Sequence, residues 1–133
     1  MVSKLWCQAC NEVVDLERNE QGRETDPHGT DAHSPGAKLD AGKNRLGLVL
    51  GAFAGALTEV GKVGTYGANK YTDNGWLSVP DGHARYTDAM YRHLLSEAKG
   101  EEYDPDTGIR HAAHAAWNAL ARLELALREV RGQ

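Results

Sequence analysis

Acidic side chains crowd into one short stretch of the chain, and two histidines follow it at once. The stretch carries five carboxylates, on Glu97, Glu101, Glu102, Asp104 and Asp106. His111 and His114 come next, about one helical turn apart. Crowded carboxylates repel one another unless a cation lies among them. The stretch is therefore a candidate site for Mg²⁺ or Mn²⁺, which accept oxygen ligands and keep waters that phosphates can replace. A solvated acidic loop is the alternative.

The candidate metal ligands come from this stretch, from its histidines and from one carboxylate elsewhere. They are Glu59, Glu97, Glu101, Asp104, Asp106 and His114. Glu59 lies next to an apolar helical stripe, so we expect it at the seam between helices; an exposed pair with Lys62 is the alternative. The candidate catalytic residues are Glu59, Glu101, Asp104 and His111. Among them, an acid or His111 would accept the proton of an attacking water.

Basic, aromatic and amide side chains supply the complementary chemistry for a nucleotide. Lysine and arginine contact phosphate oxygens, and aromatic rings and amides stack on a base and read its edge. The candidate substrate-binding residues are Lys38, Lys43, Arg45, Lys70, Tyr71, Asn74, Trp76, Arg92 and Asn118. The alternative for the aromatic members is that they close the core.

The amino terminus contains a second constellation, Cys7 and Cys10 followed by His28 and His33. The spacing is close to that of a zinc finger, with a longer middle. Structural Zn²⁺ would tether a segment that has little apolar material to bury; two reduced thiols on an untethered tail are the alternative. We therefore expect residues 1–34 to form a polar, partly irregular extension and residues 35–133 to form a helical domain.

Three helices must position these residues. Apolar residues at helical spacing over 44–63 predict a buried helix, and its glycines at every fourth position suit close packing. A second helix is expected over 81–98, with Asp81 as its N-cap and Gly100 beyond its end. A long third helix should begin at a cap on Asp106 or Thr107, and residues 64–80 should form a loop. Short links and the lack of alternating strands predict an all-α bundle.

Length and composition set wider limits. At 133 residues, with 41% hydrophobic and 26% charged residues, the chain is typical of one globular domain. The net charge of −4 argues against broad nucleic-acid binding, so no nucleic-acid partner is expected. No apolar run is long enough for a membrane span, and the start lacks the features of a signal peptide. We therefore expect a cytoplasmic protein without a membrane partner.

Several stretches together resemble a known family. They are PGAKLDAGKNR at 35–45, YGANKY at 66–71, NGW at 74–76, ARYTDAMYRHLL at 84–95 and GEEYDPDTGIRHAAHAAWNA at 100–119. In order and spacing they are similar to phage dATP/dGTP diphosphohydrolases, which resemble the all-α, MazG-like nucleoside triphosphate pyrophosphohydrolases. In that comparison Glu101 and Asp104 match a Glu-x-x-Asp metal motif, whereas Lys62 stands where a Glu-x-x-Glu motif beginning at Glu59 would have its second acid.

The resemblance implies a function. It implies an enzyme dependent on Mg²⁺ or Mn²⁺ that cleaves purine nucleoside triphosphates, dGTP especially, to the monophosphate and pyrophosphate. The MazZ type within this group implies a role in phage nucleotide metabolism, including supply for 2-aminoadenine DNA. It also implies a homodimer or homotetramer. A helical HD-type hydrolase is excluded, because no His-Asp dipeptide occurs. A non-catalytic, zinc-tethered module that binds a nucleotide or a protein is the alternative.

Overall fold

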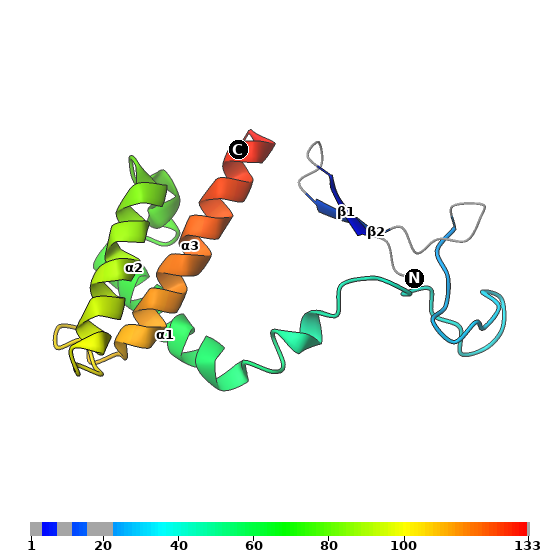
Figure 1. Cartoon of the computed structure of the whole chain (residues 1–133), viewed down its shortest axis with the longest axis horizontal. Helices are drawn as coiled ribbons and strands as arrows, with labels where there is room; N and C mark the ends of the chain where they lie inside the picture. The colour runs from blue at the N-terminus through cyan, green and yellow to red at the C-terminus, as the bar shows by residue number, and fades with distance from the viewer. Residues whose placement is uncertain (1–3, 8–11, 16–22, 133) are drawn as a thin grey trace. The chain divides into compact units, whose positions relative to one another are not determined.

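A computed structural model of the chain describes residues 4–7, 12–15 and 23–132 (Figure 1). It contains two compact units, Met1–Leu46 and Gly47–Gln133. The contacts thus divide the chain after Leu46, whereas the sequence placed a boundary after residue 34. Within the described residues, no helix is both long and apolar enough to cross a membrane.

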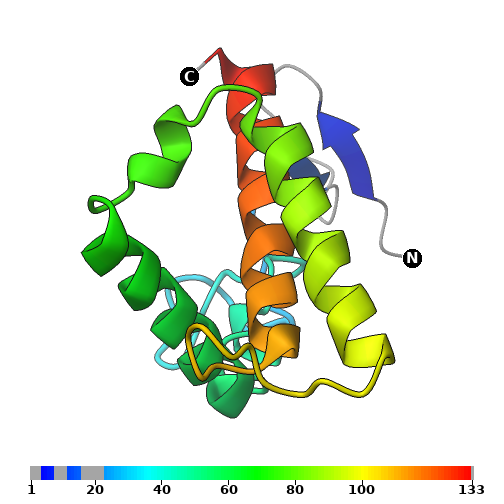
Figure 2. The same ribbon diagram turned by 90° about the vertical axis from the view of Figure 1, so that its left-hand side faces the viewer.

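The second unit is helical. Its helices are α1 (Ala54–Lys70), α2 (Gly82–Ala98) and α3 (His111–Arg131), with a short 3₁₀ helix η2 (Gly75–Ser78) between α1 and α2. Helices α2 and α3 lie side by side, and α1 packs against α3 (Figures 1 and 2). Each helix is amphipathic, as expected for elements that bury one face against a neighbour. The predicted all-α class is confirmed.

The core of this unit is built from small side chains. Its buried apolar residues are Val63, Ile109, Ala113, Ala115 and Ala121. Alanines on α3 let α2 approach it closely, because they add little bulk between the two backbones. Three aromatic rings, of Trp76, Tyr86 and Trp117, pack edge to face beside this core with centroids 5.5 to 6.4 Å apart. Among the described residues no large side chain is completely enclosed.

The first long helix differs from the prediction. Residues 46–48 form a 3₁₀ helix, η1, residues 49–53 form turns, and α1 begins only at Ala54 and continues to Lys70. The apolar side chains before α1 are exposed: Leu46, Leu48, Val49, Leu50 and Phe53. Glycines 47 and 51 raise the entropic cost of a helix there, and no packing contact in the described structure offsets it. The prediction of a buried helix over 44–63 is therefore wrong in its start, end and burial.

The expected glycine stripe on this helix is also not the surface that packs closely. A Cβ placed at Gly47 or Gly55 would meet nothing within 4 Å. The glycine at a helix contact is Gly64, where an added Cβ would lie 3.5 Å from Nε1 of Trp117. Close approach between α1 and α3 thus occurs at Gly64, nine residues beyond the last glycine of the expected stripe, Gly55.

The second helix agrees with the prediction except at its cap. Asp81 precedes α2 but has a left-handed backbone with φ of 55° and makes no side-chain capping hydrogen bond. Its carbonyl oxygen accepts a hydrogen bond from the amide of Arg85, the first bond of the helix. Gly100 follows the end of α2 with φ of 97°, a conformation that glycine adopts without strain.

The N-terminal unit contains an antiparallel pair of strands, β1 (Lys4–Cys7) and β2 (Glu12–Asp15), with Lys4 opposite Asp15. A carboxylate organises the segment that follows. Asp26 accepts backbone hydrogen bonds from His28 at 2.7 Å and from Lys38 at 2.8 Å. The zinc hypothesis on Cys7, Cys10, His28 and His33 includes Cys10, which lies outside the described residues, and it stays a prediction.

Candidate metal centre

The acidic stretch forms a closed loop between α2 and α3. The amide of Asp104 donates to the carbonyl of Ile109 at 2.9 Å, and Tyr103 pairs with Arg110 in an antiparallel bridge. The amide of His111 donates to the carbonyl of Glu102 at 2.9 Å. These bonds return the chain to the start of α3 and hold the loop over that end of the helix pair, as Figure 2 shows.

The carboxylate of Asp104 shapes this loop. Its Oδ1 accepts hydrogen bonds from the amides of Asp106 at 2.7 Å and Thr107 at 3.3 Å. Asp104 thus forms a side-chain turn with the residues that were expected to cap α3. The predicted cap at Asp106 or Thr107 is therefore wrong, and α3 begins at His111, with Arg110 at its N-cap.

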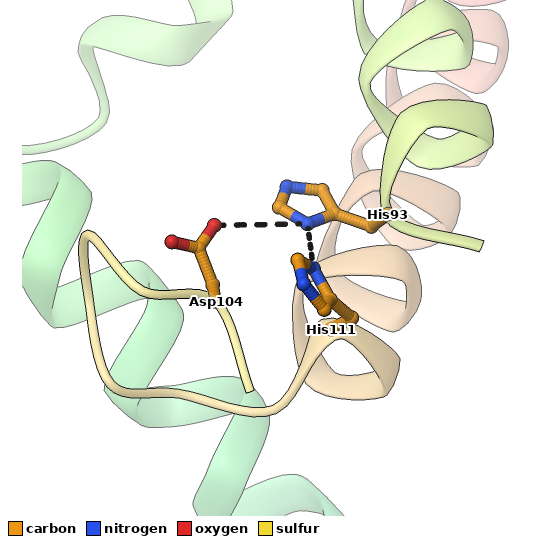
Figure 3. Close-up of side chains that lie close together, drawn as sticks. All are labelled: His93, Asp104 and His111. Atoms are coloured by element: carbon orange, nitrogen blue, oxygen red, sulfur yellow. Dashed lines mark hydrogen bonds and ion pairs between the residues drawn. The ribbon is translucent and has the colours of Figure 1, made fainter. Parts of the chain in front are cut away.

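Three side chains from three elements converge on one point (Figure 3). His93 of α2 and His111 of α3 face each other with their Nδ1 atoms 2.8 Å apart. Asp104 of the loop places Oδ2 3.9 Å from Nδ1 of His93. The donor atoms of the three residues all lie within 4.8 Å of one another. No other group of three or more such side chains converges in this way among the described residues.

Glu101 fixes the orientation of His111. Its Oε1 lies 2.7 Å from Nε2 of His111, on the side of the ring away from His93. A carboxylate only accepts hydrogen bonds, so Nε2 of His111 carries a proton, and Nδ1 is the ring nitrogen that faces His93. His111 is almost fully buried, with 3% exposure, so the ring has little freedom to turn.

A second pair of contacts fixes His114. Its ring stacks on that of His93 with centroids 4.4 Å apart and an interplanar angle of 7°. Thr107 Oγ1 accepts the amide hydrogen of Ile109 at 3.2 Å and lies 2.8 Å from Nε2 of His114. A hydroxyl has one hydrogen and two lone pairs, so Thr107 bonds to Ile109 and to His114 at the same time. The buried side chain of Asn118 donates to the carbonyl of His114 at 2.8 Å.

Burial determines the charge of these histidines. It lowers the pKa of His93, and the nearby His114 lowers it further, while Asp104 acts in the opposite direction. Burial likewise lowers the pKa of His114, against the effect of Asp104. Both rings are therefore neutral at neutral pH, which is the form of imidazole that binds metal ions.

The structure thus brings together three of the predicted residues, Glu101, Asp104 and His111, with His114 beside them. It adds His93 and Thr107, which sequence reasoning did not identify as site residues. The signal for His93 was available, because it lies four residues before the candidate ligand Glu97, on the same stripe of the expected helix. Thr107 could be recognised only from the loop that folds it back onto α3.

The other predicted metal ligands are placed differently. Glu59 accepts a hydrogen bond from Lys62 at 2.6 Å, the arrangement of the alternative interpretation. Glu97 and Asp106 are exposed and are not members of the converging group. Glu102 pairs with Arg110 on the outside of the loop.

The predicted substrate-binding residues are spread over both units. Lys38, Lys43 and Arg45 belong to the N-terminal unit, where Lys43 pairs with Glu24 at 3.0 Å. In the helical unit, the ammonium of Lys70 lies 5.3 Å from the ring centre of Tyr71. Asn74 and Arg92 are exposed, whereas Asn118 is buried.

Trp76 has a structural role that accounts for it without a ligand. Its ring packs edge to face on Trp117 with a centroid separation of 5.6 Å. The carbonyl of Trp76 also accepts a hydrogen bond from the hydroxyl of Tyr86 at 3.3 Å. Trp76 thus fills the core as the alternative interpretation expected.

The donor set discriminates between the two expected metals. Mg²⁺ requires near-octahedral oxygen coordination, whereas Mn²⁺ and the later first-row ions accept imidazole nitrogen together with carboxylate oxygen. Two imidazole nitrogens and one carboxylate oxygen therefore fit Mn²⁺ better than Mg²⁺.

The chain is similar to a known protein family and to a phage protein. A family model described as dATP/dGTP diphosphohydrolase, N-terminal, matches residues 33–133. A protein of Salmonella phage PMBT28 named dATP/dGTP diphosphohydrolase is 38% identical over 81 residues, which are 61% of this chain and 26% of that protein. The match thus spans about a quarter of the length of this relative. No solved structure matches the chain.

Proposed function

Because the chain belongs to the family of dATP/dGTP diphosphohydrolase N-terminal domains, we propose that it hydrolyses purine deoxynucleoside triphosphates between the α and β phosphates. The products are the monophosphate and pyrophosphate, and dGTP is the favoured substrate. The observation that carries the proposal is the convergence of His93, Asp104 and His111 within the residues that the family model matches. A dGMP product would enter phage nucleotide metabolism, including supply for 2-aminoadenine DNA.

A divalent ion held by His93, Asp104 and His111 would lower the pKa of a water molecule and neutralise phosphate charge. Two of the chain's own residues would prepare this site for the ion. Asp104 brings negative charge beside the His93 ring, and Glu101 holds the His111 ring in one orientation. The side chain of Glu101 is also 52% exposed, so it reaches solvent and is our candidate for the proton acceptor.

Two exposed cationic side chains of the helical unit are suited to the triphosphate. Arg92 is exposed on α2, directly before His93. Lys70 is exposed at the end of α1, where it lies over the ring of Tyr71. We propose Arg92 and Lys70 as phosphate contacts in this unit, and Tyr71 and Asn74 as contacts to the base.

We also propose that the chain acts as a homodimer or a dimer of dimers. An apolar groove of about 460 Å³ runs between α1 and α3, lined by residues that include Leu57, Val60, Leu120, Leu123 and Leu127. Leucines 120 and 123 are more than half exposed. The core of the helical unit has no enclosed large side chain among the described residues, so a second copy that covers the groove would supply the missing apolar contact.

The reaction is tested by its products. The full chain is incubated with dGTP and Mn²⁺, and the nucleotides and phosphates are separated. The proposal expects dGMP and pyrophosphate in equal amounts. Release of orthophosphate with dGDP, or the absence of hydrolysis with every purine triphosphate and metal, would contradict it.

The variant Asp104→Asn links the reaction to the site. Asparagine keeps a side-chain oxygen that accepts the amide hydrogens of Asp106 and Thr107, so the loop retains its turn while the negative charge is lost. We expect a loss of activity of about 100-fold or more, in line with the loss of a metal ligand or charge-stabilising group. Asp88→Asn, at an exposed aspartate of α2, is the matched control and should retain full activity.

A further inference from the structure

We propose that His93, Asp104 and His111 bind one first-row transition-metal dication, of the series from Mn²⁺ to Zn²⁺, and that Mg²⁺ does not compete for this position. The inference deepens the proposed function, on which it rests for the use of the ion. Binding itself is measured without substrate, so that binding and hydrolysis can fail separately.

The separations between the three donors are close to those in a metal site. With metal–ligand bonds of about 2.1 Å, neighbouring donors lie roughly 3.0–3.4 Å apart in octahedral or tetrahedral coordination. The observed separations are 2.8 Å between the two Nδ1 atoms and 3.9 Å from His93 Nδ1 to Asp104 Oδ2. These two values lie on either side of the required range, and the donor atoms of all three residues lie within 4.8 Å of one another, so small side-chain shifts complete the geometry.

The protons on the two rings are arranged for replacement by a cation. Since Nε2 of His111 donates to Glu101, Nδ1 of His111 is the nitrogen that faces His93. The 2.8 Å contact between the two Nδ1 atoms needs one proton between them. A metal ion bound by both Nδ1 atoms would displace this proton, to Nε2 of His93 where that nitrogen is free and otherwise to solvent, and both Nδ1 lone pairs would then face the ion.

The surroundings keep both rings in place. His111 is buried between Glu101 and His93, and His114 covers one face of the His93 ring. The hydroxyl of Thr107 holds His114 in turn. Ligands that are fixed before the ion arrives lose little entropy on binding, which favours a specific site over a loose acidic surface.

The nitrogen donors set the selectivity. Imidazole suits borderline ions, whose affinity rises from Mn²⁺ towards Cu²⁺, whereas Mg²⁺ requires oxygen and gives up its water reluctantly. Only one of the three donors is a carboxylate oxygen. Additional Mg²⁺ bound through the substrate's phosphates would be a separate ion at a separate position.

Calorimetry and absorption with Co²⁺ test the site in the full chain without nucleotide. We expect one Co²⁺ per chain and no displacement by an excess of Mg²⁺. His93→Asn and His111→Asn should each weaken Co²⁺ binding by more than about 100-fold, since even loss of a supporting group beyond the ligands costs 10- to 100-fold. His83→Asn, an exposed histidine on the same helix, is the matched control. Equal Co²⁺ affinity in the His93 variant, or full competition by Mg²⁺, would overturn the proposal.

A measurement on the unaltered chain removes any dependence on the folding of the variants. Nitrogen-15 spectra of the histidine rings, recorded with and without Zn²⁺, report which ring nitrogen carries a proton. We expect Nδ1 of His93 and of His111 to take on the signature of metal coordination, with Nε2 of both rings protonated. Spectra in which these two rings do not respond to Zn²⁺ would also overturn the proposal. Hydrolysis with no Co²⁺ or Zn²⁺ binding would count against the inference alone, and binding with no hydrolysis against the proposed function alone.

Discussion

Glu101 Oε1 lies 2.7 Å from Nε2 of His111 and so determines which nitrogen of that ring faces His93. The pair joins the loop to the first residue of α3. A carboxylate that accepts a hydrogen bond from the ring N–H of a metal-binding histidine raises the basicity of the ring and fixes its tautomer. Glu101 thus acts on the site through His111, in addition to its proposed role with water.

Glu101→Gln should weaken Co²⁺ binding by about 10- to 100-fold, because the neutral amide is a poorer partner for Nε2 of His111. The measurement is calorimetric titration of the full chain. Glu102→Gln is the matched control, since Glu102 pairs with Arg110 and not with a histidine. Equal affinities for the two variants would show that the Glu101–His111 contact has no effect on the metal.

Thr107→Val should lower the free energy of unfolding by about 1–3 kcal/mol, because it removes a hydroxyl that bonds both His114 and the amide of Ile109. Valine keeps the shape, so the loss is that of the hydrogen bonds. Urea unfolding followed by circular dichroism measures it. Thr65→Val, at an exposed hydroxyl that bonds only its own helix, is the control and should change stability little.

Part of this arrangement could be predicted from the sequence. The all-α class, the bounds of α2 and the choice of Glu101, Asp104 and His111 as candidates follow from local periodicity and from spacing. The start of α3 could not be predicted, because Asp104 competes for the amides that a helix cap would use. The same local hydrogen bonds bring Thr107 close to His114. No helical or strand periodicity in the sequence indicates this contact.

The start that the sequence predicted for α1 was wrong for a different reason. The apolar residues at 46–53 have helical spacing, but spacing alone does not provide a surface to pack against. The sequence left two interpretations of Glu59 open, a metal ligand and a partner of Lys62. Only the fold shows the contact with Lys62. The spacing of His93 from Glu97 could be read from the sequence. The role of His93 nevertheless depends on α3 lying alongside α2.

Trp117→Ala should destabilise the helical unit by about 2–4 kcal/mol. Its ring contacts those of Trp76 and Tyr86, and Gly64 of α1 lies against it, so the substitution leaves a cavity where α1 and α3 meet. Thermal unfolding and urea titration measure the change. Tyr71→Ala, at a ring that is 73% exposed, should cost less than about 0.5 kcal/mol. A similar small cost for Trp117 would mean that the aromatic cluster does not support the unit.

Asp26→Ala should increase hydrogen exchange at the amides of Lys38 and His28, which donate to this carboxylate. These hydrogen bonds, with that from Lys38 the largest cause, hold the pKa of Asp26 below its ordinary value of 3.8. The contribution is therefore fully present above that value and is lost as the pH falls through the lowered pKa. Exchange measured from neutral to acidic pH should reach that of the variant at low pH. Protection that persists unchanged in Asp26→Ala would contradict this account.

Leu120→Glu and Leu123→Glu should each convert the proposed oligomer to a monomer. Both side chains are more than half exposed and line the groove between α1 and α3. A charge buried at an apolar interface between two copies, without a partner, costs several kcal/mol. Light scattering after gel filtration measures the mass of each species. Glu129→Lys, a charge change at an exposed position on α3 that does not line the groove, should leave the mass unchanged. If the unaltered chain is monomeric at high concentration, or if both leucine variants keep the oligomer, the groove is not the interface between copies.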